Sequence, residues 1–149
     1  MLKIAVGTDH RGFEHKNVIQ NGVSIEQKHI EWIDVGCYSQ QRTDYPHYAF
    51  DVVRLMQDKK ADLGILLCGT GVGMAIAANR FAGMRAGVVW DERTAQRAKE
   101  EDDINILVLP ADFISPEHAV RLVIVWLNAQ FKAGRYLDRL HMIDACSGL

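Results

Sequence analysis

A run of apolar and small residues at positions 63–68, LGILLC, is the feature that most constrains the fold of this chain. A strand with one face in water alternates apolar and polar side chains, whereas this run is apolar on both faces. It is typical of a central strand in a parallel sheet that helices cover on both sides. Glycines follow it directly, and an apolar helical stripe begins soon after, at Met74 and Ala77. We therefore expect a strand-to-helix junction at the centre of the fold.

The alternation of strands and helices extends along the whole chain. Four further apolar runs predict the other strands: residues 2–7, 30–36, 84–90 and 104–110. Helical patterns lie between and after the strands: about 11–21, from Pro46 onward, 74–81, about 91–101 and 116–131. Five strands that alternate with helices predict a single domain over residues 1–149. Its architecture is three-layer α/β/α, a Rossmann-like fold with a five-stranded parallel sheet.

Residues 116–131 form the most apolar of the predicted helices. Its positions 122–127, Leu-Val-Ile-Val-Trp-Leu, leave it without a polar face. A helix on the surface of a globular domain needs only one apolar stripe. We expect this helix either to be sandwiched between other elements or to form a contact between subunits, to which the segment near 134–143 is a second candidate contributor.

Composition excludes several classes of protein. The chain has 149 residues, of which 48% are apolar and 24% charged, and its formal net charge of -2 gives no reason to expect nucleic acid or an anionic membrane as a partner. No stretch reads as a membrane span or a signal peptide. Three cysteines without a C-x-x-C pattern argue against a disulfide framework, so a reducing cytoplasm is the expected location.

Polar residues gather where the predicted strands end. In open parallel sheets, ligands bind beyond the carboxyl ends of the strands. The residues that follow the five predicted strands there are Asp9 and His10, Asp44 and Tyr45, Cys68, Asp91, and Asp112. Any fold of this kind places some polar residues at this edge, so a function has to come from a more specific motif.

The segment Cys-Gly-Thr-Gly-Val-Gly at 68–73 is that motif. Its glycines let the backbone approach a ligand closely and point successive N–H groups into one space, and the helix that follows adds the positive end of its dipole. This anion cradle is expected to lower the pKa of the Cys68 thiol. A thiolate beside N–H donors suits nucleophilic attack on a carbonyl or proton abstraction next to one. The alternative is a small buried residue, with glycines that only form the turn.

Other interpretations of the motif fit less well. A dinucleotide fingerprint would need glycine where Met74 stands, and a Walker loop would need a Gly-Lys-Ser/Thr sequence. A thiol-dependent hydrolase or redox protein would need a base or a second cysteine near Cys68, which the local sequence lacks. The six histidines are scattered without ligand spacing, so we expect neither a metal nor another cofactor.

Four segments together resemble one family of enzymes. They are GTDHRGFEHK at 7–16, RTDYPHYA at 42–49, DLGILLCGTGVGMAIAANRFAGMRA at 62–86 and GRYLDR at 134–139. In combination they are similar to the type B ribose-5-phosphate isomerases, which are grouped with galactose-6-phosphate isomerase. The resemblance runs from Ile4 to about Ile143. It implies a cofactor-independent aldose–ketose isomerase of phosphorylated sugars, a homodimer or homotetramer with sites at the subunit interface.

The resemblance also implies roles for single residues. Cys68 is implied as the base that moves a proton between C1 and C2 through a cis-enediolate, with Thr70 as its hydrogen-bonding partner. The amides implied as the anion hole are those of Gly69, Gly71 and Gly73. The other implied substrate contacts are Asp9, His10, Tyr45, Asn79, Asp102, Arg135 and Arg139. The two arginines would bind phosphate, although four-residue spacing on a helix also fits a solvated face.

The sequence departs from the family pattern at three places. Glu101 stands where the family has a histidine that opens the sugar ring, so Glu101 is expected to join catalysis, with His10 as the alternative. Asp112 stands just past the fifth strand, where an arginine for phosphate is expected, and Tyr136 replaces a histidine. A carboxylate near a phosphate dianion is repulsive, so we expect Asp112→Arg to favour phosphorylated pentoses.

These departures leave the substrate less well defined than the reaction. The candidates are ribose 5-phosphate, a tetrose or hexose phosphate, and an unphosphorylated sugar. A sugar-binding homologue without catalytic activity is the alternative to an enzyme.

Overall fold

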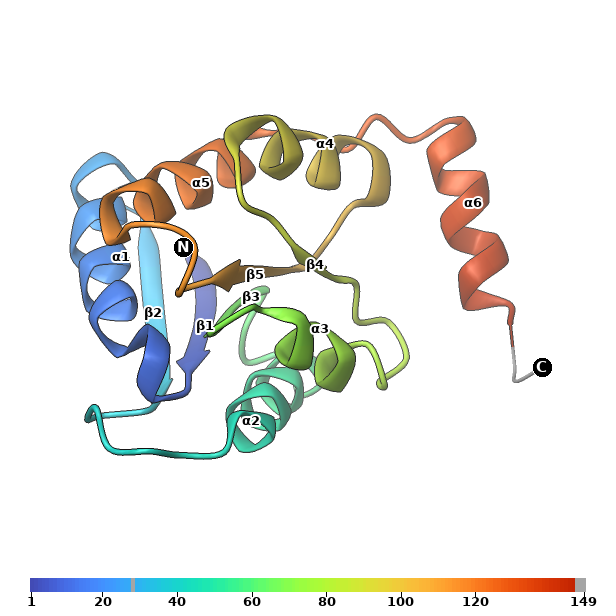
Figure 1. Cartoon of the computed structure of the whole chain (residues 1–149). Coiled ribbons are helices and arrows are strands. Elements are labelled where there is room, and N and C mark those ends of the chain that lie inside the picture. Colours follow the sequence, from blue (N-terminus) through green and yellow to red (C-terminus); the bar gives the residue numbers. More distant parts are fainter. Residues whose placement is uncertain (28, 147–149) are drawn as a thin grey trace.

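The computed structural model of the chain describes residues 1–27 and 29–146. At its centre lies one sheet of five strands in the order β2-β1-β3-β5-β4, and every neighbouring pair is parallel (Figure 1). The strands are β1 (Leu2–Thr8), β2 (Ile30–Gly36), β3 (Leu63–Cys68), β4 (Ala86–Val88) and β5 (Ile106–Pro110). The predicted five-stranded parallel sheet is therefore confirmed, with β3 at its centre.

Helices cover both faces of the sheet. They are η1 (His10–Gly12, a 3-10 helix), α1 (Phe13–Glu26), α2 (Tyr45–Gln57), α3 (Val72–Ala78), α4 (Glu92–Asp102), α5 (Pro116–Asn128) and α6 (Arg135–Asp144). Helices α1, α4 and α5 supply the core on one face, and α2 and α3 supply the core on the other (Figure 1). The three-layer α/β/α, Rossmann-like architecture is confirmed. Across the described residues, no helix is both long enough and apolar enough to cross a membrane.

The central strand β3 is covered on both faces, as its apolar sequence predicts. Its residues from Gly64 to Cys68 are all buried. Ile65 and Leu67 belong to the core under α1 and α5, whereas Leu66 and Cys68 belong to the core under α2 and α3. Burial of one large aliphatic side chain contributes about 1.5–3 kcal/mol, so β3 anchors both helical layers.

Helix α5 is sandwiched, which was one of the two alternatives for its apolar sequence. It packs against α1 and α4, and it buries Leu122, Val123 and Trp126 almost completely. The Trp126 indole N–H also donates to the carbonyl oxygen of Ile104 (3.3 Å). Because the chain itself takes up these apolar side chains, they do not require a contact between subunits. The helix ends at Asn128, short of the predicted residue 131.

Two strands are shorter than their apolar runs. β4 covers only three residues of the predicted 84–90, and β5 begins at Ile106 rather than at 104. Before β4, the Arg85 N–H donates to the side chain of Asn105 (2.8 Å) instead of joining the ladder. After β4, the Asp91 carboxylate accepts from the Thr94 N–H (2.7 Å) and caps α4. Polar hydrogen bonds therefore set these strand ends, and Asp91 serves as a helix cap.

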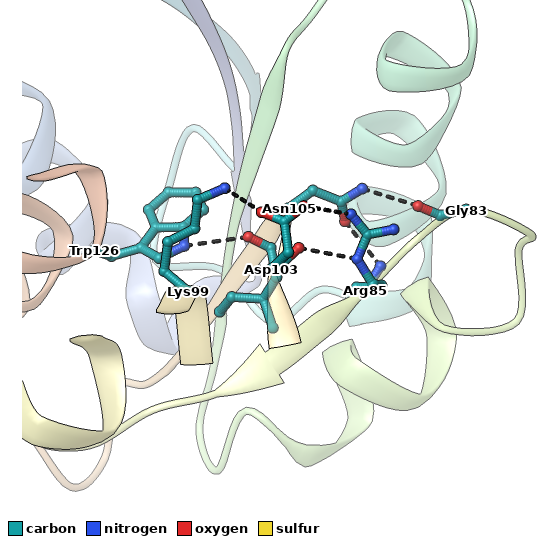
Figure 2. A network of polar contacts seen from close by, with 7 residues as sticks. Gly83, Arg85, Lys99, Asp103, Asn105 and Trp126 are labelled. Atoms are coloured by element: carbon teal, nitrogen blue, oxygen red, sulfur yellow. Dashed lines mark hydrogen bonds and ion pairs between the residues drawn. The ribbon is translucent and has the colours of Figure 1, made fainter. Parts of the chain in front are cut away.

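A polar network fixes the turn between α4 and β5 (Figure 2). Asp103, the C-cap of α4, has a left-handed backbone with φ 44°. Its carboxylate accepts from Lys99 Nζ (2.6 Å) and Arg85 Nη2 (3.1 Å), and its carbonyl oxygen accepts from Arg85 Nε (2.9 Å). Asn105 completes the network by donating to the carbonyl oxygen of Gly83 (2.9 Å). The network holds the end of α4 against the segment that enters β4.

A buried ion pair fixes the opposite side of the sheet. The Lys16 side chain on α1 is 1% exposed, and its Nζ donates to Asp34 Oδ1 (2.7 Å) and to the carbonyl oxygen of Cys37 (2.7 Å). Asp34 Oδ1 also accepts from the Gly36 N–H (2.8 Å). These bonds hold the end of β2 and the start of the loop that leads to α2.

We predict that Asp34→Ala destabilises the fold by about 3–5 kcal/mol, because it leaves the buried Lys16 ammonium without its carboxylate. Urea denaturation measures the free energy of unfolding. The control is Asp51→Ala, which removes the exposed pair with Arg54 (3.3 Å) and should change that free energy by less than about 1 kcal/mol. Equal effects of the two substitutions would show that the Lys16 pair is not structurally important.

Candidate active site

Cys68 ends β3 at the carboxyl edge of the sheet, and the loop that follows it bends back over the sulfur. The thiol is buried, with the residue 5% exposed. Gly71 is the N-cap of α3 and has φ +79°, a conformation that favours glycine. The chain therefore turns tightly enough for the backbone amides of Met74, Gly71 and Thr70 to face the sulfur. The Thr70 hydroxyl accepts from the Val72 N–H (3.2 Å), which fixes the start of the helix.

The expectation that the cradle lowers the pKa of the Cys68 thiol is wrong for the protein without substrate. Burial raises the pKa of Cys68 above its ordinary value, and the nearby Asp9 carboxyl raises it further. The backbone amides of Met74, Gly71 and Thr70 oppose this rise without overcoming it. Burial disfavours the charged form of a thiol, so the sulfur is protonated at neutral pH.

Two of the loop glycines are required by side chains that lie against the loop. A Cβ atom at position 73 would lie 2.5 Å from Cζ of Tyr45, so the Tyr45 ring rests on the start of α3. A Cβ atom at position 69 would lie 2.7 Å from Asp112 Oδ2 and 2.9 Å from Arg11 Cδ. These glycines thus do more than form a turn, because they admit three polar side chains to the surroundings of Cys68.

Asp9 and His10 lie beside this loop, as predicted. Asp9 is 6% exposed, its N–H donates to the carbonyl oxygen of Leu67 (3.3 Å), and its carboxyl accepts from the Arg11 N–H (2.9 Å). Burial raises the pKa of the Asp9 carboxyl above its ordinary value. The Thr43 N–H donates to Nδ1 of His10 (3.3 Å), so Nε2 carries the proton of the neutral ring and is free to donate.

Sequence reasoning missed Arg11, which the structure places at this edge. Its guanidinium forms an ion pair with Asp112 directly beside Gly69. Asp112 is therefore next to the Cys68 loop, but a cation already compensates its charge. The available signal was the variable position in the Asp-His-x-Gly motif, which Arg11 occupies.

The remaining predicted site residues lie at the opposite edge of the sheet. Cys68 pairs with Pro110 at the carboxyl end of β5, whereas Gly64 pairs with Ile106 at its start. The four residue steps from Gly64 to Cys68 span about 13 Å of strand. Glu101 and Asp102 end α4 just before that start, so one chain does not bring them to its own Cys68.

Arg135 and Arg139 belong to the same distant group. Lys132 joins their segment to the end of α4, because its N–H donates to the Glu100 carbonyl oxygen (2.9 Å) and its Nζ pairs with the Glu100 carboxylate (3.1 Å). The hydrogen bond to Tyr136 and the nearby Glu101 carboxylate raise the pKa of Arg135 above its usual value. Helix α6, which carries both arginines, stands out from the body of the molecule (Figure 1).

Tyr136 holds the two arginines together. The guanidinium carbons of Arg135 and Arg139 lie 5.1 Å and 5.7 Å from the centre of the Tyr136 ring, within cation–π range. Both arginines are exposed, and within residues 1–27 and 29–146 neither forms an ion pair with a carboxylate. The two arginines thus form a pre-arranged cationic surface without an ion-pair partner among those residues, which suits an anion better than a merely solvated face does.

Asn79 has a structural role in its own chain. Its amide donates to the Ala86 carbonyl oxygen (2.9 Å) and accepts from the Ala86 N–H (2.8 Å), which joins the end of α3 to β4. It also lines a hollow of about 400 Å³ at the distant edge, together with Asp102, Leu140 and Ile143. The expectation that Asn79 shapes the pocket around Cys68 therefore finds no support within one chain.

The predicted residues thus form two groups. The first, which we call the Cys68 group, lies at the carboxyl edge and comprises Asp9, His10, Tyr45, Cys68, Gly69, Thr70, Gly71 and Gly73. The arginine group lies at the amino edge and comprises Asn79, Glu101, Asp102, Arg135 and Arg139. Among the residues that the structure describes, no three His, Cys, Asp or Glu side chains are arranged to hold a metal ion.

The fold is that of an α/β protein, and the Cys68 group is its candidate small-molecule site, at the carboxyl edge of the sheet. The family model described as Ribose/Galactose Isomerase matches residues 4–143. Ribose-5-phosphate isomerase B of Escherichia coli (strain K12) is 43% identical over 145 residues, which are 97% of this chain and 96% of that relative. The chain belongs to the ribose/galactose isomerase family.

Solved structures agree with this assignment. A ribose 5-phosphate isomerase from Thermotoga maritima has a TM-score of 0.91 at 43% identity, over 97% of this chain and 99% of that chain. Ribose-5-phosphate isomerase B from Mycoplasma genitalium, solved with bound ribulose-5-phosphate, has a TM-score of 0.88 at 34% identity, over 96% of this chain and 94% of that chain. The likeness therefore covers the fold and nearly the whole sequence.

We predict that iodoacetamide alkylates Cys68 at least about tenfold more slowly than the exposed Cys146 at pH 7.5, because the thiolate is the reactive form. The rate at Cys68 should keep rising above about pH 8.5, the ordinary thiol pKa, since its own pKa is raised. Mass spectrometry of the labelled peptides measures both rates. A Cys68 rate that is already maximal near pH 7 would contradict the raised pKa.

Proposed function

We propose that this chain is a cofactor-independent aldose–ketose isomerase that interconverts ribose 5-phosphate and ribulose 5-phosphate, or a closely related sugar-phosphate pair. The observation that carries the proposal is a buried thiol, faced by backbone amides and a buried carboxyl, in a chain 43% identical to a ribose-5-phosphate isomerase B. A relative of the same family has been solved with ribulose-5-phosphate bound, which supports the substrate class.

The proposed chemistry follows from this arrangement. The Cys68 thiolate takes the proton from C2 of the open-chain aldose, the C2–H electron pair forms the enediol double bond, and the carbonyl electrons move to the oxygen on C1. The proton of the C2 hydroxyl then passes to the oxygen on C1, the electrons left on the C2 oxygen form the ketone carbonyl, and the thiol returns its proton to C1. Backbone amides of the Gly69–Gly73 loop stabilise the enediolate oxygen, which is where negative charge develops. The raised thiol pKa makes the thiolate a stronger base but also the minor form at neutral pH, so Cys68 has to release its own proton before this step.

A substrate that binds as a closed furanose needs a second acid–base group to open its ring, whereas an open-chain substrate does not. His10 is the candidate in the Cys68 group. Its Nδ1 accepts a hydrogen bond from the Thr43 N–H, so its Nε2–H can donate to the sugar. Glu101 is the candidate in the arginine group, where it stands in place of the expected histidine. Tyr45 and Asp9 bind the sugar hydroxyls beside Cys68, and the Asp102 carboxylate is a further hydroxyl acceptor.

A complete site requires both groups, so we infer a homodimer or larger assembly in which one subunit supplies Cys68 and its partner supplies the arginine group. Three features support this arrangement. The arginine group cannot reach Cys68 within one chain, and Arg135 and Arg139 are exposed without acidic partners in the part of the chain that the structure describes. Apolar side chains are also exposed at both edges: Val72, Ile76, Trp90 and Phe113 near the carboxyl edge, and Met142 and Ile143 on α6.

We predict that Cys68→Ala lowers kcat for isomerisation of ribose 5-phosphate by about 100- to 10,000-fold, the usual loss for a well-placed base. The same substitution should stop exchange of the C2 hydrogen with D₂O, which NMR measures directly. Cys146→Ala, at an exposed position, is the control and should keep full activity. Retention of more than a few per cent of activity and exchange in Cys68→Ala would assign the proton transfer to another group.

The shared site can be tested by mixing two inactive variants. Cys68→Ala and the double variant Arg135→Met/Arg139→Met should each be nearly inactive alone. After unfolding and refolding of a one-to-one mixture, half of the dimers are mixed and each carries one intact site, so about one quarter of wild-type activity should return. No recovery, although mixed dimers form, would place both groups in the same subunit's site or leave the arginines outside it.

A further inference from the structure

The ion pair of Arg11 and Asp112 forms a bridge across the end of β3. Arg11 follows the end of β1, Asp112 follows the end of β5, and β3 lies between these two strands. Backbone bonds fix both ends of the bridge, since the Arg11 N–H donates to Asp9 Oδ1 (2.9 Å) and the Asp112 N–H donates to the carbonyl oxygen of Gly69 (3.0 Å). The pair therefore lies over the residue that follows Cys68.

Contact with the loop is close on both sides of the pair. A Cβ atom at position 69 would lie 2.7 Å from Asp112 Oδ2 and 3.0 Å from Arg11 Nη1. A side chain at position 69 would therefore displace the ends of both side chains of the pair. The loop that faces the thiol and the ion pair are thus built around each other.

Fold stability does not account for the pair. The side chains of Arg11 and Asp112 are 54% and 36% exposed, and exposed ion pairs contribute little to folding. Partial exposure also leaves the polar groups of the pair accessible to a ligand bound beside the Cys68 loop.

The charges of the pair decide what kind of ligand group it suits. Asp112 compensates the guanidinium, so the pair adds no net charge to an edge that already holds the carboxyl of Asp9. A phosphate dianion next to the Asp112 carboxylate would be repelled. A sugar hydroxyl both donates and accepts, and the pair offers guanidinium N–H donors beside carboxylate acceptors.

We propose that the Arg11–Asp112 pair is a specificity-determining element of the isomerase site, which binds hydroxyl groups of the sugar chain and not its phosphate. The inference rests on the proposed function and adds to it. It assigns the phosphate to the arginines of α6, and it makes the pair responsible for recognising the hydroxylated carbons next to the reacting ones.

The test is the double variant Arg11→Met/Asp112→Leu, which keeps the net charge and approximate side-chain volumes while removing every hydrogen-bonding group. The control is Glu92→Gln, which breaks another exposed pair, the one that joins α4 to Arg121 on α5 (3.0 Å, with side chains 50% and 57% exposed). Both variants are compared with wild type for kcat/KM on ribose 5-phosphate, and on the tetrose or hexose phosphate that wild type turns over fastest if ribose 5-phosphate is not a substrate. Inhibition by inorganic phosphate is measured in parallel, and thermal unfolding verifies the fold.

We expect the double variant to lose about 10- to 100-fold in kcat/KM, the loss that follows from removing one or two hydrogen bonds to charged groups. Its inhibition constant for inorganic phosphate should stay within about twofold of wild type, because the net charge is unchanged and the pair does not contact phosphate. The Glu92→Gln control should match wild type in both measurements.

Two results would overturn the assignment of the pair and leave the proposed function standing. Unchanged kcat/KM in the folded double variant would show that the pair does not contact the sugar. Inorganic phosphate inhibition weakened by about tenfold or more would show that Arg11 binds phosphate instead. A wild type that isomerises no sugar phosphate and exchanges no C2 hydrogen would overturn the proposed function, and the assignment of the pair with it.

Discussion

The burial of β3 on both faces is the constraint on which the rest of the structure depends. Helices close off the two faces of the sheet, so a ligand can approach this strand only at its ends. Cys68 stands at the carboxyl end, partly inside the core under α2 and α3, and that position gives the thiol its raised pKa. The glycines that follow leave space for Tyr45 and the Arg11–Asp112 pair to pack against the loop. The residues from Cys68 to Gly73 therefore belong both to the edge of the core and to the candidate site.

A parallel α/β fold also decides which residues can meet within one chain. Each strand delivers its carboxyl end to one edge, and each following helix returns the chain to the other edge before the next strand begins. Cys68 ends a strand, whereas Glu101 and Asp102 end a helix, so the height of the sheet separates them. Burial fixes the position of Cys68, and the network of Lys99, Asp103 and Arg85 fixes the end of α4 that carries Glu101 and Asp102 (Figure 2). Two rigid half-sites on one chain are what an isologous pair of subunits can combine.

Hydrophobic periodicity predicted the sheet, its parallel character and the sandwiched or interfacial nature of α5, because burial leaves a regular pattern in the sequence. The strand ends were harder to predict, since the Arg85 N–H just before β4 bonds to a side chain, and Asp91, just beyond it, caps α4; these bonds join residues with no regular spacing. The prediction that the Cys68 pKa is lowered was wrong for a similar reason. The motif shows the backbone amides that lower the pKa, but it does not show the depth of burial that raises it. Arg11 and Asp112 lie 101 positions apart, so only the folded chain reveals that they form a pair.

Helix α6 carries one further consequence. It buries a single residue, Leu140, within its own chain, while its arginines and its terminal apolar side chains face outward. A helix with so little buried surface in its own chain has most to gain from a second surface to pack against. Where that surface belongs to a second subunit, assembly and competence for turnover are one equilibrium, governed by mass action. The turnover per subunit then depends on the concentration of the protein itself, and no separate effector is needed for that dependence.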